Sequence, residues 1–152
     1  MIVDGHSAII HALTDFLKTV PTFNVVAGVK TLAEARHVAQ CNTLHLVTID
    51  IRLPDGNGIN LAMELGTSHP DLATLAYTSD DKVETVKQAR NAGVRGYVLK
   101  GAELQRLTLA IEVVLAGGIY LDPDLPKKPM PEGEKLTPTE DKVMALRQMD
   151  DD

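Results

Sequence analysis

The stretch LHLVTIDIRLPDG, residues Leu44–Gly56, decides the fold class of this chain. An apolar run rich in β-branched residues, which is typical of a buried strand, leads directly to Asp50 and then to a loop with Pro54 and Gly56. A charged carboxylate is costly to bury unless a partner compensates its charge. Asp50 is therefore expected to be paired, to bind a metal ion or to take part in chemistry.

Other short apolar segments alternate with amphipathic helical patterns along the chain. The predicted strands are Met1–Val3, Phe23–Val29, Leu44–Ile49, Ala73–Tyr77 and Gly96–Leu99. The predicted helices are Ser7–Lys18, one opened by the capping box Thr31–Glu34, Gly58–Leu65, Asp81–Ala92 and Ala102–Ala116. These β-then-α units predict an α/β fold, (βα)5, with a doubly wound parallel five-stranded sheet covered by helices on both faces. The first strand is short, as expected if the chain begins late in it.

A change in composition after Tyr120 predicts the domain organisation. Residues 1–120 are expected to form the α/β domain, and the Pro-rich residues 121–135 a stiff linker. Residues 136–152 open with Leu-Thr-Pro-Thr-Glu, in which Thr137 and Glu140 suit a capping box. One short helix is marginal on its own, so this segment is interpreted as the start of an incomplete second domain. The alternative is a C-terminal helix that docks back on the core.

Charge and composition limit the functional classes. The net charge of −6 argues against nucleic-acid binding by this chain itself. The single cysteine, Cys41, excludes an internal disulfide and fits a reducing compartment. The sequence contains neither an apolar run long enough to span a membrane nor a signal-peptide pattern, so we expect a cytoplasmic protein without membrane association.

Polar residues stand at the ends of the predicted strands, where open parallel sheets bind ligands. Asp4, Asp50, Thr78 and Lys100 follow the first, third, fourth and fifth strands. Two neighbouring carboxylates repel each other unless a cation intervenes, and Mg²⁺ is a suitable cation because it prefers oxygen ligands. An ammonium and a hydroxyl at the same edge suit the oxygens of a phosphoryl group.

This set of residues resembles the receiver domain of two-component response regulators, which has a flavodoxin- or CheY-like fold. The segments that carry the resemblance are Val47–Pro54, Gly96–Lys100 and, with one departure, Ile2–His6. Arg95–Lys100 and Ala116–Leu121 are similar to the NarL/LuxR-type subfamily, which carries a C-terminal helix-turn-helix output domain.

The resemblance to the receiver domain covers Met1 to about Tyr120. Leu136–Glu140 resembles the opening of that output domain. The recognition helix would lie beyond residue 152, so DNA would be bound only through the full-length output domain and not by this chain. The subfamily implies transcription regulation, with a homodimer as the expected assembly.

The resemblance also implies roles for the site residues. Asp50 would accept a phosphoryl group from a sensor histidine kinase, without the chain being an enzyme. Mg²⁺ would be held by Asp4, Asp50 and the backbone carbonyl of Arg52. The phosphoryl-binding and switch residues would be Thr78, Lys100 and Tyr97.

Gly5 is the departure from the family pattern, which usually has a second acid at this position. Its absence predicts weaker Mg²⁺ binding and slower phosphorylation, and it opens the alternative of an atypical receiver that signals without phosphate. Asp55, in the loop after Asp50, is a further candidate that would reach the ion through a water molecule. His6 and His11 are interpreted as structural or solvated, since no third zinc ligand follows.

Two other functions compete with this interpretation. Asp4-Gly5-His6 resembles the start of the Asp-x-His motif of cobalamin-binding domains, although Ile9 stands where that motif has glycine. A phosphatase-type hydrolase could use Asp50 as its nucleophile, but such enzymes favour a second aspartate where this chain has Arg52. Thr78 could also act only as the cap of the helix that follows it.

Overall fold

The computed structural model describes residues 1–126 as an α/β domain. Its elements, in chain order, are β1 Ile2–Val3, α1 Ser7–Leu17, β2 Gly28–Val29, α2 Leu32–Cys41, β3 Leu46–Ile49, β4 Arg52–Leu53, β5 Gly56–Asn57, α3 Gly58–Ser68, β6 Ala73–Thr78, α4 Val83–Asn91, β7 Gly96–Leu99, α5 Leu104–Leu115 and β8 Tyr120–Leu121. Within this described range, no helix combines the length and apolar character needed to cross a membrane.

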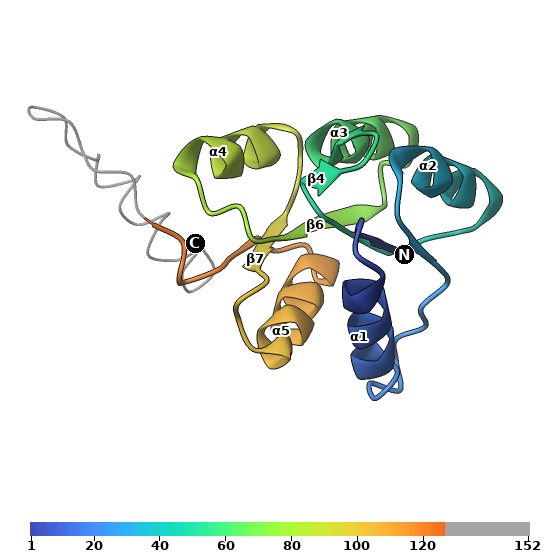
Figure 1. The fold of residues 1–152 in the computed structure, drawn as a ribbon, viewed down its shortest axis with the longest axis horizontal. Helices are drawn as coiled ribbons and strands as arrows, with labels where there is room; N and C mark the ends of the chain where they lie inside the picture. The colour runs from blue at the N-terminus through green and yellow to red at the C-terminus, as the bar shows by residue number, and fades with distance from the viewer. Residues whose placement is uncertain (127–152) are drawn as a thin grey trace, which may run out of the picture.

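The main sheet is parallel throughout and has the strand order β2-β1-β3-β6-β7-β8. Helices α2, α3 and α4 cover one face, and α1 and α5 cover the other (Figure 1). The predicted doubly wound α/β architecture is therefore confirmed. The described structure adds a sixth short strand, β8, and a separate antiparallel hairpin formed by β4 and β5.

Each face of the sheet has its own apolar core. On the α1 and α5 side, Leu13 and Leu107 pack against the fully buried strand residue Val98. On the opposite side, Leu61 of α3 belongs to the same buried cluster as Val47 of β3. Strands buried on both faces explain why the sequence shows continuous apolar runs instead of alternation.

Local signals define the helix ends as expected. The Thr31 hydroxyl accepts a hydrogen bond from the Glu34 amide at 3.1 Å, while the Glu34 carboxylate accepts one from the Lys30 amide. Gly93 ends α4 in the left-handed region with φ +93°, and the Val94 amide bonds back to the Ala89 carbonyl. These contacts satisfy backbone groups that a helix end otherwise leaves unpaired.

The second predicted strand is much shorter than expected. We predicted Phe23–Val29, whereas β2 contains only Gly28–Val29. The reason is pairing, because the neighbouring β1 offers only Ile2 and Val3 to bond with. A run with strand propensity forms a ladder only where a partner strand lies beside it.

The ordered domain extends past the expected boundary at residue 120. The Asp122 amide bonds to the Tyr97 carbonyl at 2.8 Å, and the buried Asp122 carboxylate accepts bonds from the Leu99 amide and the Arg106 guanidinium. Leu125 packs against the core. Residues 121–125 thus belong to the domain and not to a free linker. The rest of the predicted linker, and the segment 136–152, lie outside the described residues.

Gly58 allows α3 to begin against the strand that carries Asp50. A Cβ at position 58 would lie 2.0 Å from the Asp50 carbonyl oxygen and 2.7 Å from Ile49. The Gly58 amide also donates to the Ile51 carbonyl at 2.7 Å. A side chain here would therefore push α3 away from the end of β3.

Gly58→Ala is expected to lower the free energy of unfolding by about 3 kcal/mol or more, since overpacking against backbone cannot be relieved by a rotamer change. Gly66→Ala, in the same helix with open space around its Cβ position, is the matched control. It should stabilise the domain by about 0.5–1 kcal/mol because alanine is the better helix former. Urea denaturation measures both, and a similar effect of the two substitutions would contradict this account.

Candidate functional site

The site lies at the carboxyl edge of the sheet, where backbone bonds fix the positions of two aspartates. The Asp4 amide donates to the Val29 carbonyl at 3.0 Å, and the Asp50 amide donates to the Val3 carbonyl at 2.9 Å. Each aspartate thus directly follows the last paired residue of its strand. Both are almost fully buried, with 2% and 5% of their surface exposed. Their carboxylates meet at one point, as the strand-end argument predicted.

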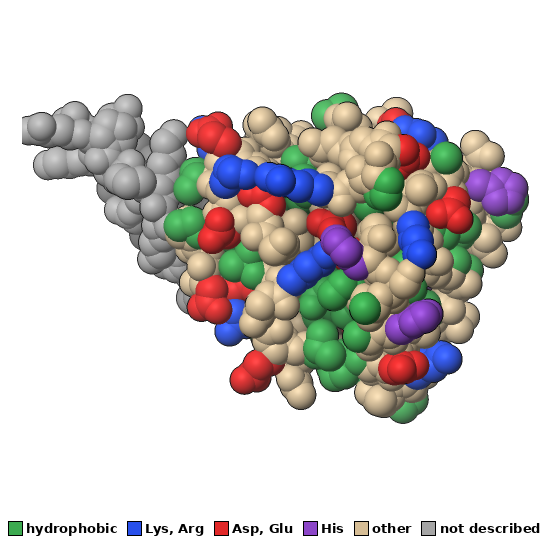
Figure 2. All heavy atoms as spheres, in the orientation of Figure 1, with side chains coloured by type: hydrophobic (Ala, Val, Ile, Leu, Met, Phe, Trp, Pro, Cys, Tyr) green, Lys and Arg blue, Asp and Glu red, His purple; other side chains and the backbone are tan. Residues whose placement is uncertain are grey.

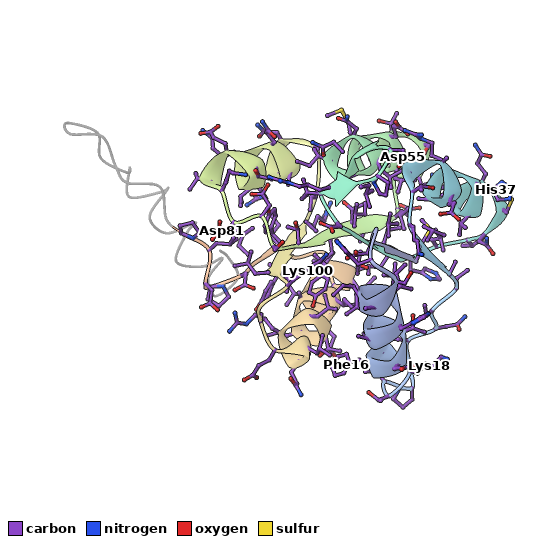
Figure 3. The ribbon with its side chains drawn as sticks, viewed as in Figure 1. Phe16, Lys18, His37, Asp55, Asp81 and Lys100 are labelled. Carbon is purple, nitrogen blue, oxygen red and sulfur yellow. The ribbon has the colours of Figure 1, made fainter. Side chains whose placement is uncertain are left out.

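Lys100 compensates the two buried charges. Its Nζ lies 2.7 Å from Asp4 Oδ2 and 2.8 Å from Asp50 Oδ2, and its amide donates to the Thr78 carbonyl at 3.0 Å. Figure 3 shows Lys100 between the two helix layers. Burial acts against its charge, but the hydrogen bonds to Asp4 and Asp50 outweigh this effect and raise the pKa of Lys100. The ammonium therefore stays charged between the carboxylates.

Thr78 and Tyr97 meet at the loop that follows β6. Both side chains are buried, and the Thr78 hydroxyl accepts a hydrogen bond from the Asp80 amide at 3.2 Å. The Tyr97 hydroxyl donates to the Asp80 carbonyl at 2.5 Å. Burial raises the pKa of Tyr97 well above its usual value, so this hydroxyl keeps its proton. The N-cap of α4 is Lys82, so Thr78 supports the loop ahead of the helix and does not cap it.

Basic side chains surround the Asp80 carboxylate at the rim of the site. Arg52 lies 3.8 Å and Lys82 3.7 Å from Asp80 Oδ2, and the Thr85 hydroxyl donates to the same oxygen. Although burial alone would raise it, the pKa of Asp80 is lowered by bonds from the Lys82 amide and Thr85. Figure 2 shows basic, acidic and histidine side chains near the centre of this face. An anion approaching the site would meet positive charge.

His6 is the site residue that sequence reasoning missed. Its amide and its Nδ1 both lie within hydrogen-bond distance of Asp4 Oδ1, at 2.9 and 3.0 Å. Asp4, His6 and Asp50 each offer one ligand atom, and these atoms all lie within 4.8 Å of one another. The signal in the sequence was the spacing of two residues between Asp4 and His6. A search for a third zinc ligand nearby in the sequence could not find this group, because Asp50 comes from a distant strand.

The sequence also led to predictions for Gly5 and Asp55, which lie near Asp4 and Asp50 along the chain. Gly5 faces the loop after Asp50, where an added Cβ would lie 3.2 Å from Pro54 Cδ. Asp55 does not turn toward the pocket, which corrects the suggestion that it assists the ion. Its carboxylate accepts bonds from the Leu32 and Ala33 amides at 2.8 and 3.2 Å, beside α2 (Figure 3). These bonds, chiefly the one from Leu32, lower the pKa of Asp55.

Replacing Lys100 by methionine leaves two buried carboxylates without their cation. Lys100→Met is expected to lower the free energy of unfolding by about 3–5 kcal/mol at pH 7.5. Asp4→Asn in the Lys100→Met background should recover part of the loss, because it removes one of the two repelling charges. Urea denaturation of the three proteins at pH 7.5 tests this, and a double variant no more stable than Lys100→Met would contradict it.

Comparisons with known proteins agree with this geometry. The family described as "Response regulator receiver domain" matches residues 1–112. The DNA-binding transcriptional activator DevR/DosR of Mycobacterium tuberculosis is 36% identical over 121 residues, covering 80% of this chain and 56% of the relative. The transcriptional regulatory protein UhpA of Escherichia coli is 30% identical over 124 residues, covering 82% and 62%. The chain spans less than two thirds of the length of these relatives.

Solved structures show the same fold. A LuxR-family two-component response regulator from Aurantimonas has a TM-score of 0.78 at 28% identity, with 82% of this chain and 89% of that chain covered. A CheY-like receiver domain protein from Methanospirillum hungatei has a TM-score of 0.71 at 24% identity, covering 76% and 91%, which supports the fold alone. With the family match over most of its length, the chain belongs to the response regulator receiver domains of two-component signalling, among relatives that regulate transcription.

Proposed function

We propose that this chain is a phosphorylation-dependent switch in which Asp50 accepts a phosphoryl group from a sensor histidine kinase. The observation that carries the proposal is the Lys100 ammonium, held within 2.8 Å of both Asp4 and Asp50 at the carboxyl edge of the sheet. The Lys100 ammonium can exchange its contact with Asp50 for one with an incoming phosphoryl oxygen without moving far.

The transfer step follows from the chemistry of a carboxylate nucleophile. An oxygen of Asp50 attacks the phosphorus of the kinase phosphohistidine, and a P–O bond forms as the P–N bond breaks. The electron pair of the broken bond stays on the imidazole nitrogen of the donor. Lys100 then holds a phosphoryl oxygen, and the Thr78 hydroxyl turns from the Asp80 amide to donate to another. Arg52 and Lys82 at the rim attract the anionic donor.

A divalent cation fits the donor set of the pocket, since two buried carboxylates with a single ammonium leave one negative charge uncompensated. We propose that Mg²⁺ is held by Asp4, Asp50 and the carbonyl of Arg52, and that it neutralises charge on the group in transfer. Gly5 supplies no ligand, so the binding should be weak.

A second candidate is a receiver that signals without phosphate, and the position of Tyr97 favours it. Receiver domains of this type are expected to move this aromatic side chain inward on activation. In this chain Tyr97 is already fully buried, with its hydroxyl on the Asp80 carbonyl. Lys100 at the same time neutralises part of the pocket charge. The phosphorylated and unphosphorylated states would then differ little.

The wider context is also a proposal. DevR/DosR is described as a DNA-binding activator, so the switch is proposed to control a helix-turn-helix output domain that begins after the Pro-rich linker, with residues 136–152 as its start. DNA contact would come only from that domain in the full-length protein. Homodimerisation and a cytoplasmic location fit this role.

Incubation with acetyl phosphate and saturating Mg²⁺ should add one phosphoryl group to the intact mass of the protein. Asp50→Ala should abolish the gain, because it removes the proposed nucleophile. A gain that persists in Asp50→Ala would assign the acceptor role to another group, with Asp4, 2.7 Å from Lys100, as the first candidate. Asp55→Asn, which changes an exposed acid in the following loop, is the matched control and should label as wild type does. Wild type that stays unlabelled would instead support the phosphate-independent candidate.

Gly5→Asp should tighten Mg²⁺ binding by about ten-fold, which corresponds to roughly 1.4 kcal/mol for one added carboxylate ligand. Gly5→Ala separates this effect from crowding against Pro54 and should leave the affinity near that of wild type. Isothermal titration with MgCl₂ measures all three proteins. Equal affinities of Gly5→Asp and wild type would show that the missing acid does not limit the site.

A further inference from the structure

The pocket contains a nitrogen donor where an all-oxygen site would be expected. Nδ1 of His6 lies 3.0 Å from Asp4 Oδ1, and the His6 amide holds the same oxygen at 2.9 Å. The backbone bond fixes the orientation of the Asp4 carboxylate toward the imidazole. Asp50 completes a group of three possible ligands that the chain brings together from β1, the following loop and β3.

The spacing of these atoms suits a single ion. Ligands about 2.1 Å from an octahedral ion lie roughly 3.0 Å apart when adjacent and roughly 4.2 Å apart when opposite. The Asp4–His6 separation of 3.0 Å equals the spacing of adjacent ligands. The three ligand atoms lie within 4.8 Å of one another, slightly more than the spacing of opposite ligands, so they would have to move slightly closer together to share one ion. His6, whose side chain is 70% exposed, can make this movement cheaply.

Lys100 does not determine which divalent ion the pocket prefers. Its ammonium contacts Oδ2 of Asp4 and Oδ2 of Asp50, whereas the imidazole faces Oδ1 of Asp4. The repulsion between Lys100 and a divalent ion is the same for every ion of that charge. The identity of the donor atoms is therefore what distinguishes one ion from another. Mg²⁺ gains little from an imidazole, whereas first-row transition-metal ions bind it well.

We propose that His6 is a metal ligand and that, with Asp4 and Asp50, it makes this pocket prefer a first-row transition-metal ion over Mg²⁺. The inference concerns the cation of the proposed phosphoryl-acceptor site and in that sense rests on the proposed function. The imidazole would supply a ligand atom in a pocket where Gly5 supplies none. Ligation uses the neutral ring, with its proton on Nε2.

The test is binding of MnCl₂ to the full chain at pH 7.5, followed by electron paramagnetic resonance. Wild type should bind one Mn²⁺ with a directly coordinated ¹⁴N detected by electron spin echo modulation. His6→Gln should lose the nitrogen signal and at least about ten-fold in Mn²⁺ affinity, the lower end of what disturbing a ligand costs. Mg²⁺ affinity, measured by competition, should change by less than about two-fold.

His11→Gln is the matched control, because it removes an imidazole at an exposed position of α1, the helix that His6 precedes. It should keep both the nitrogen signal and the Mn²⁺ affinity. The inference is overturned if wild type shows no coordinated nitrogen, if His6→Gln retains it, or if His6→Gln weakens Mg²⁺ and Mn²⁺ equally. Thermal unfolding without metal confirms that both variants are folded.

Labelling of the same proteins by acetyl phosphate with saturating Mg²⁺ separates the two proposals. If wild type is labelled on Asp50 but shows no coordinated nitrogen, the phosphoryl-acceptor proposal stands and His6 is not a metal ligand. If wild type shows a coordinated nitrogen but is not labelled, His6 is a metal ligand and the acceptor proposal fails.

Discussion

The structure depends on one buried ion cluster, the Lys100 ammonium between the carboxylates of Asp4 and Asp50. Two carboxylates at this depth would repel each other and resist folding without a cation. The cluster therefore links the ends of three strands in one electrostatic unit. The Lys100 ammonium, which stabilises the folded state, is also the group to which an anionic ligand could bind. The proposed acceptor function therefore relies on the same three side chains as the stability of this edge of the sheet.

The convergence of Asp4, Asp50 and Lys100 was predictable because it follows from topology. Parallel strands present their carboxyl ends at one edge, so residues far apart in the sequence meet once the strands are identified. Loop geometry was not predictable in this way. Asp55 was assigned to the pocket from its proximity in sequence, but the β4–β5 hairpin carries it to the amide groups of α2. His6 was interpreted as structural or solvated, and its contact with Asp4 became visible only in the folded loop.

The loop after β6 connects the chemistry to the outer face of the domain. The Asp80 carbonyl accepts a hydrogen bond from the Tyr97 hydroxyl, and the Asp80 amide donates one to the Thr78 hydroxyl. A phosphoryl oxygen would accept a hydrogen bond from the Thr78 hydroxyl, whereas the Asp80 amide donates to that hydroxyl. The amide contact would therefore be lost only if the Thr78 side chain had to rotate away from Asp80 to reach the phosphoryl group, and the Tyr97 contact would remain.

Asp122 extends this reasoning to the end of the described chain. Its backbone amide donates to the Tyr97 carbonyl and its carboxylate accepts from the Leu99 amide, both on one edge of β7, and Arg106 neutralises it from α5. The last described residues are therefore fixed to β7 by backbone and side-chain hydrogen bonds. A tilt of β7 would displace Asp122 together with the strand, because two bonds join them along the same edge.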